Sequence, residues 1–171
     1  MHPTSRTIPQ RRRAFLGVCA LAVPLLAGAA PATFTVVPGK TERLSVQAVG
    51  VQVYDCRADE AGQLKWMFRE PLATLTVDGK TVGHHFVGPA WELDDGSRVT
   101  GKVVAQAPGE GEQDIALLQL QVTSHQGQGV LAAVDEVQRL DTRGGKFAGS
   151  CMQAGALHVE PYSARYVFFG R

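Results

Sequence analysis

The sequence predicts an all-β fold: a single-domain antiparallel β-sandwich or barrel, arranged as a hairpin meander with little helix. Short stretches in which apolar and polar residues alternate recur along the chain, and this period of two is typical of strands with one buried face. Glycine-containing turn signals separate the stretches, and neither a repeat nor a second composition interrupts them. We therefore expect about eight to ten short strands around one core.

The central segment, residues 78–99, carries the clearest hairpin signals. Asp-Gly pairs at 78–79 and 95–96 each lie between alternating apolar residues. Asp-Gly favours a tight hairpin turn because glycine adopts positive φ without a steric penalty. Gly-Pro at 88–89 separates the two hairpins, since proline cannot donate a ladder hydrogen bond and belongs at a strand end or edge. The segment is therefore predicted to be an antiparallel meander.

The strand expected at residues 81–87 contains two adjacent histidines. Alternation places His84 on one face with Val82 and Phe86, and His85 on the opposite face. Because His84 shares its face with two apolar residues, we expect it to be half-buried, most simply as a structural histidine with a satisfied hydrogen bond. Adjacent side chains point apart, so the pair cannot ligate one metal unless the strand ends or bulges there.

The other strands follow from the same alternation. Residues 44–48 alternate, and Gly50 shifts the phase so that Val51 and Val53 share a face, which predicts two short strands or one strand with a bulge. The segment 130–140 is ambiguous: apolar residues recur every three positions, as in a helix, but the Gly-rich flanks favour a strand. Further strands are expected at 64–68, 73–77, 99–105, 118–122 and 166–169, with a loop at 141–149.

Residues 1–29 have the features of a cleaved signal peptide. Three arginines at 11–13 precede a short apolar stretch at 14–26, and Ala-Gly-Ala at 27–29 matches the cleavage pattern. The apolar stretch is too short for a membrane span. Arg-Arg-Ala-Phe-Leu at 12–16 also matches the twin-arginine export signal, so both export routes remain open. We expect residues 30–171 to form a single β-domain that is exported to the periplasm or beyond the cell.

Removal of the leader makes the protein slightly acidic. Four arginines leave with the leader, so 13 basic residues face 16 acidic ones and the net charge is near −3. A basic footprint is the usual mark of a protein that binds nucleic acid or an anionic membrane surface. We therefore expect neither partner.

Two cysteines, Cys56 and Cys151, lie beyond the leader. In an exported protein an even count is most simply one disulfide. It would close a loop of about 95 residues and stabilise the fold by about 4–5 kcal/mol through the entropy of the unfolded chain. No Cys-x-x-Cys spacing is present, so we expect a structural bond and no redox pair.

An ordered series of motifs runs along the mature chain: VYDCRA at 53–58, LKW at 64–66, GPAWE at 88–92, DGSxVxGKV at 95–103, VQRLDTxGG at 137–145 and PYSA at 161–164. Together with Cys151, the series resembles an exported bacterial and fungal family of proteins of unknown function. The resemblance covers nearly all of the mature chain. It implies an exported, single-domain protein with two cysteines, and it implies no catalytic residues.

Two functional classes fit these observations. The first is a non-enzymatic protein that binds a small ligand or a cell-envelope partner, in a pocket lined by His84, Trp91 and Glu92, with Arg139 as a more distant candidate. The alternative is a metal-dependent or redox enzyme that uses His84 or His85 with nearby carboxylates. The sequence contains no metal-ligand spacing, Gly-x-Ser-x-Gly or Gly-x-Gly-x-x-Gly. It therefore favours the first class, with no cofactor, over the enzyme and over an envelope protein without a pocket.

Overall fold

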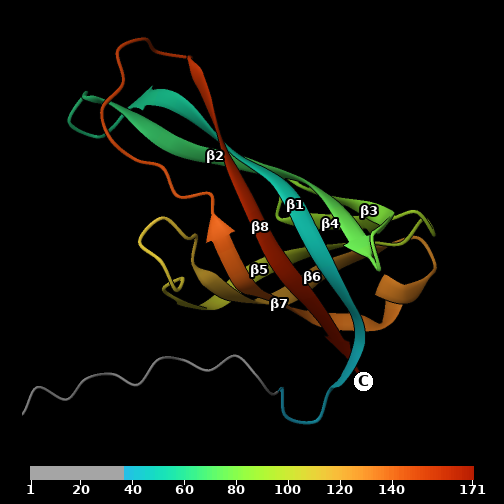
Figure 1. Ribbon diagram of the computed structural model, residues 1–171. Coiled ribbons are helices and arrows are strands. Elements are labelled where there is room, and N and C mark those ends of the chain that lie inside the picture. The colour runs from blue at the N-terminus through green and yellow to red at the C-terminus, as the bar shows by residue number, and fades with distance from the viewer. Residues whose placement is uncertain (1–36) are drawn as a thin grey trace, which may run out of the picture. The chain divides into compact units, whose positions relative to one another are not determined.

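A computed structural model describes residues 37–171, so the predicted signal peptide lies outside the described residues. Within this range, eight antiparallel strands form one closed barrel: each strand pairs with the next along the chain, and β8 closes the ring on β1 (Figure 1). The prediction of an all-β meander with little helix is confirmed, and the barrel is the alternative that forms. The elements are β1 Thr41–Ala58, β2 Leu64–Val77, β3 Lys80–Phe86, β4 Ala90–Leu93, β5 Arg98–Ala107, β6 Leu117–Gln126, the 3-10 helix η1 Val130–Ala133, β7 Val134–Gly144 and β8 Leu157–Gly170.

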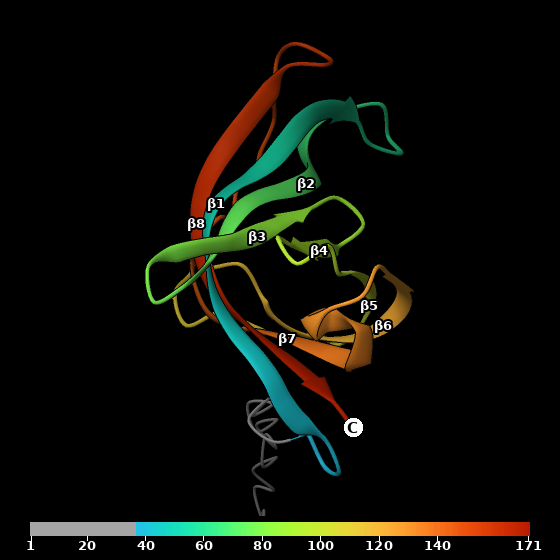
Figure 2. The ribbon, with the colours of Figure 1, turned by 90° about the vertical axis from the view of Figure 1, so that its right-hand side faces the viewer.

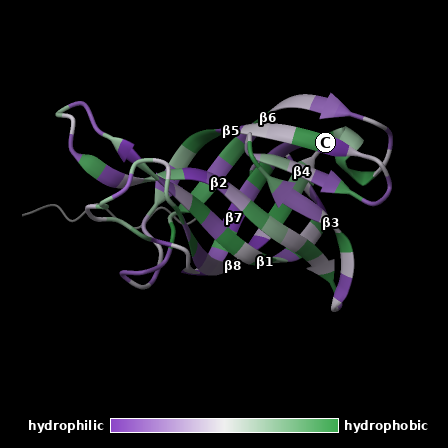
Figure 3. Cartoon of the chain, turned by 90° about the horizontal axis from the view of Figure 1, so that it is seen from above, coloured by the Kyte–Doolittle hydropathy of each residue, from purple (hydrophilic) through white to green (hydrophobic). Residues whose placement is uncertain are grey.

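Alternation along the strands separates the barrel interior from its surface. Figure 3 shows apolar and polar residues alternating along the strands that form the barrel wall. The inward residues at one end form a continuous core, in which Trp91 and Phe168 are fully buried. The helical turn η1 covers this end with Leu131, which is also fully buried. One end of the barrel is thus packed with side chains, and Figure 2 shows β3–β7 curving around the interior.

Both predicted hairpins are confirmed. β2 and β3 are joined by Asp78 and Gly79, whose φ angles of 50° and 75° are those of a tight primed turn. β4 and β5 are joined by residues 94–97. A Cβ at Gly83, which has φ of 158°, would collide with the carbonyl oxygen of Glu92 on β4. Glycine there lets the two strands approach closely as the sheet curves.

The predicted phase shift at Gly50 is wrong. Of the two predicted alternatives, one strand with an irregularity forms, but the irregularity lies between Val53 and Tyr54 and not at Gly50. Gln52 is therefore buried, while Val51 lies on the outer face beside Leu72. Predicting the inward face from apolar residues assumes that the interior is apolar. Gln52 is polar and faces inward, so the pattern of apolar residues pointed to the wrong face.

The strand at 64–68 and the strand at 73–77 are one strand, β2, despite Pro71. Pro71 pairs with Gln52 of β1, but the pairing of β2 with β3 begins only at Ala73. The proline is therefore at an unpaired edge, where its missing N–H costs no ladder hydrogen bond. The ambiguous segment 130–140 divides into η1 and the first part of β7, so the strand prediction holds only from Val134 onward.

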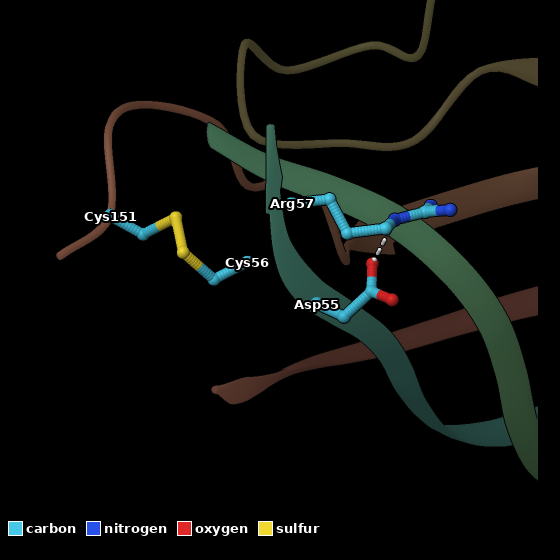
Figure 4. The surroundings of a disulfide bond; sticks show 4 residues. All are labelled: Asp55, Cys56, Arg57 and Cys151. Atoms are coloured by element: carbon cyan, nitrogen blue, oxygen red, sulfur yellow. Dashed lines mark ion pairs between the residues drawn. A yellow bond between two sulfur atoms is a disulfide. The ribbon is translucent and has the colours of Figure 1, made fainter. Parts of the chain in front are cut away.

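The predicted disulfide is confirmed. Cys56, near the end of β1, is bonded to Cys151 in the loop between β7 and β8, with 5.9 Å between the two Cα atoms (Figure 4). An ion pair of 2.7 Å joins the neighbouring side chains of Asp55 and Arg57. The backbone N–H of Trp66 also donates to the carbonyl of Gly149 at 3.0 Å. The long loop is thus held against β1 and β2.

Candidate ligand-binding cavity

The end of the barrel opposite η1 is hollow. A cavity of about 950 Å³ lies between the later part of β1, the first part of β2, and the ends of β5, β6 and β7 that are distant from η1. Apolar side chains form much of its wall: Phe68, Pro71, Pro89, Val103, Ile115 and Leu118. A cavity of this size with a mainly apolar wall is typical of a small-molecule site.

Four polar side chains reach the cavity from β1, β3 and β7: Gln52, Tyr54, His85 and Arg139. Gln52 is only 2% exposed, and its Nε2 has no hydrogen-bond partner among the described residues. Tyr54 donates its hydroxyl hydrogen to the carbonyl of Gly145 at 2.7 Å and accepts the N–H of Phe147 at 3.2 Å. Tyr54 is therefore fixed by the fold, whereas Gln52 retains an unused donor.

His85 is held as a neutral imidazole. Its Nδ1 lies 2.8 Å from the carbonyl oxygen of Ala90, and because a carbonyl only accepts, Nδ1 must carry the proton. The ring stacks on Trp91, with 4.7 Å between centroids and 8° between planes. Burial lowers the pKa of His85 to about 4, and the nearby charge of Arg139 contributes to the same shift. At neutral pH the cavity thus has an uncharged imidazole on this side.

Behind His85, a layer of buried aromatic side chains separates the cavity from the core. Tyr166 packs against His85, with 4.9 Å between ring centroids, and against Trp91 at 5.3 Å. The indole N–H of Trp91 has no hydrogen-bond partner in residues 37–171. The hydroxyls of Tyr162 and Tyr166 interact with each other, and Tyr166 with Arg139, but neither hydroxyl forms a hydrogen bond of good geometry in this range. Burial raises the pKa of both tyrosines, so their hydroxyls stay protonated and can donate.

Arg139 brings a positive charge to the cavity from β7. Its Nε donates to the carbonyl oxygen of Ala116 at 3.0 Å. In the described part of the chain its guanidinium forms no ion pair. The charge acts on His85 and Tyr54, in each case in addition to the larger effect of burial on their pKa. The guanidinium therefore lies within electrostatic reach of the other polar groups of the cavity.

The rim of the cavity is fixed by hydrogen bonds between the β5–β6 loop and the end of β7. Asp114 accepts the N–H groups of Gly144 at 2.7 Å and Gly111 at 2.8 Å. The bond to Gly144, with that to Gly111, lowers the pKa of Asp114. Thr142 donates its hydroxyl to the carbonyl of Ile115 at 2.7 Å. The carboxylate on this rim is thus occupied by backbone groups.

Of the four residues predicted to line a site, only Arg139 lines this cavity. Trp91 lies behind His85 in the core. His84 and Glu92 lie on the outer face, where they are direct partners across β3 and β4, and Glu92 pairs with Arg98 at 3.7 Å. His84 borders a separate outer groove of about 490 Å³.

The expected half-burial of His84 is wrong: His84 is exposed, and His85 is the buried histidine. The inward face of β3 carries Gly83 and His85, while Val82 and Phe86 are half-buried and Val82 packs against the core. Counting apolar neighbours therefore assigned the wrong face. Gln52 and Tyr54 were not foreseen, although their spacing continues the inward series of Val46 and Ala48 on β1.

The alternative hypothesis required ligands to converge on the histidines. His84 and His85 point to opposite sides of the barrel wall. Across residues 37–171, no three His, Cys, Asp or Glu side chains are grouped so that they could hold a metal ion.

No helix within residues 37–171 is long and apolar enough to cross a membrane.

Comparison with known proteins identifies the family. A search of curated proteins and a search of solved structures each found no match. One family model, described as "Protein of unknown function (DUF3455)", matches residues 37–170 and thus spans the whole barrel. The chain belongs to this DUF3455 family.

Proposed function

We propose that the protein is an exported, non-enzymatic binding protein that holds a small organic molecule in the hollow end of its barrel. The observation that supports this proposal most directly is the cavity of about 950 Å³, which has a mainly apolar wall and one unpaired buried donor, Gln52 Nε2, among its lining residues. Eight-stranded barrels have an interior just wide enough to hold one small ligand.

The buried polar atoms add to this support. An unpaired buried donor costs about 1–3 kcal/mol relative to a paired one, and Gln52 Nε2 is such a donor at the cavity wall. A ligand that accepts its hydrogen bond would recover part of that cost. The fixed rim at Asp114 and Thr142 would spare the ligand the cost of ordering a mobile loop.

Export is part of the proposal. The leader-like residues 1–29 precede the barrel, and the bond between Cys56 and Cys151 is of a kind that persists in oxidising compartments. A ligand met outside the cytoplasm, or a partner in the cell envelope that presents a small group to the cavity, would fit this location.

Native mass spectrometry of the untagged protein, purified without chelator from cells that export it, tests the proposal. We expect one organic molecule bound per chain. Val103 lines the cavity from β5, whereas the adjacent Val104 does not and is 53% exposed. Val103→Trp should therefore remove the adduct and Val104→Trp should keep it. A bare wild-type mass, or an adduct with the mass of a metal ion, would count against the proposal.

A further inference from the structure

Arg139 brings a half-buried positive charge to the cavity, without an acidic partner in residues 37–171. A guanidinium carries five N–H donors and remains charged in proteins. The Nε of Arg139 donates to the carbonyl oxygen of Ala116 at 3.0 Å. The terminal N–H groups form the planar fork suited to an oxyanion. Arg139 also interacts with the Tyr166 hydroxyl, but a neutral hydroxyl does not balance the charge, and no acidic side chain in residues 37–171 pairs with the fork.

None of the acidic residues that line the cavity, Glu110, Glu112 and Asp114, forms an ion pair with Arg139 in residues 37–171. Asp114 directs its two carboxylate oxygens to the N–H groups of Gly144 and Gly111. Glu110 forms an ion pair of 2.8 Å with Arg143. A third cavity residue, Arg69, is already paired with Glu70 at 2.9 Å. Arg139 is thus distinguished from the other arginines of this region by having no acidic partner.

The neighbours of Arg139 complete an environment for an anion. His85 is neutral, Gln52 offers an unpaired N–H, and the wall beyond them is apolar. Removing a charge from water is costly unless an opposite charge accompanies it. A ligand that brings one negative charge would offset that cost, and an apolar remainder would fill the larger part of the cavity.

We propose that the cavity binds an amphipathic carboxylate, in which the terminal N–H groups of Arg139 hold the carboxylate and the apolar wall covers the rest of the molecule. This inference rests on the proposed function, because it names the chemical class of ligand for the same cavity. A hydrogen bond to a charged group contributes more than a neutral one, so the carboxylate is expected to bind about 10- to 100-fold more tightly than a neutral molecule of the same shape.

A matched pair of fluorescent probes tests this assignment. The first probe is 11-(dansylamino)undecanoic acid and the second is the corresponding carboxamide, which has the same apolar body without the charge. The wild-type chain should bind the acid about 10- to 100-fold more tightly than the amide. In Arg139→Gln, which can still donate to Ala116, this preference should disappear, while Arg139→Lys should retain part of it because the charge remains.

Arg69→Gln is the matched control, since it removes one positive charge from the same cavity at a side chain already paired with Glu70. It should keep the preference for the acid. Unchanged circular dichroism of all three variants would show that they remain folded. If Arg139→Gln keeps the preference, or if the wild-type chain binds acid and amide equally, the carboxylate assignment is overturned while small-ligand binding stands. If neither probe binds the wild-type chain, the proposed function fails as well.

Discussion

At the scale of single residues, the informative positions are polar side chains inside the barrel. His85 is 2% exposed and stacks on Trp91, which is fully buried. Each is adjacent in sequence to an exposed polar residue, His84 and Glu92 respectively. A one-residue change of register would exchange these pairs between core and solvent. The cavity thus depends on the register of β3 against β4.

The buried, neutral His85 should make stability depend on pH. The imidazole titrates near 6.5 when solvated and at about 4 in the fold because burial disfavours its charged form. The fold therefore favours the neutral form of His85. The difference between the two pKa values corresponds to about 3 kcal/mol of unfolding free energy, and this stability is fully present above pH 6.5. It is lost as the pH falls toward 4.

Denaturant unfolding of the wild type and of His85→Gln between pH 7.5 and 4 measures this dependence. The variant should lose less stability on acidification, even though loss of the stacked ring lowers its stability at every pH. His84→Gln changes an exposed histidine on the same strand and should follow the wild-type profile. Parallel profiles for all three proteins would contradict a buried neutral His85.

For single residues, the sequence singled out side chains worth examining, but it did not predict on which face of the sheet they lie. Arg139 lines the cavity, but the faces of His84 and His85 were exchanged, and Gln52 was hidden by the assumption of an apolar interior. A period of two fixes which residues share a face. It does not say which face is inside when the inward face lacks large apolar side chains, as on β3, where the buried residues are Gly83 and His85.

At the scale of elements, turn chemistry and cysteine count were the reliable signals. The Asp-Gly pair at 78–79 forms the predicted tight turn because both residues adopt positive φ. Strand lengths were less predictable: β1 and β2 continue through Gly50 and Pro71. Pairing with neighbouring strands decides those extensions, and no local pattern encodes it.

The Cys56–Cys151 bond should be quantitative and stabilising. Alkylation of unreduced protein under denaturing conditions should find no free thiol, because the bond holds both sulfurs. Replacing both cysteines with serine should lower the unfolding free energy by about 4–5 kcal/mol, the chain-entropy value for a loop of about 95 residues. Full labelling of both cysteines before reduction would contradict the structure.

The cap of the packed end depends on Asp95. Its carboxylate accepts the N–H of Val130 at 2.9 Å and the hydroxyl of Ser97 at 2.6 Å, and Ser97 in turn accepts the N–H of Leu131 at 3.2 Å. Asp95 thus joins the β4–β5 turn to η1, which covers the core with Leu131.

Asp95→Ala should lower the unfolding free energy by about 1–3 kcal/mol, because the Val130 N–H loses its acceptor and the Ser97 hydroxyl, which accepts the Leu131 N–H, loses the carboxylate that orients it. Amide hydrogen exchange at Val130 and Leu131 should accelerate in the same variant. Asp94→Ala alters the neighbouring exposed residue of the same turn and should change neither. Equal exchange in both variants would show that the cap does not depend on Asp95.

At the scale of the whole molecule, the barrel divides into a packed end and a hollow end. Large side chains such as Trp91 and Phe168 occupy the packed end. The hollow end carries glycines and prolines in the loops at 88–89 and 108–111, which leave its interior unfilled. The sequence predicted the class of fold, but it could not show this division, since it arises only when eight strands close into one ring.

The central claim is that the hollow end takes up a small molecule. A fluorescence titration with the neutral probe N-phenyl-1-naphthylamine, run in parallel on the wild type, Val103→Trp and Val104→Trp, tests it most directly. Saturable binding of one probe per chain is expected for the wild type and for Val104→Trp, because Val104 lies outside the cavity. In Val103→Trp the larger side chain fills the cavity, and binding should be lost. Absence of saturable binding to the wild type, or equal binding by the two variants, would contradict the account.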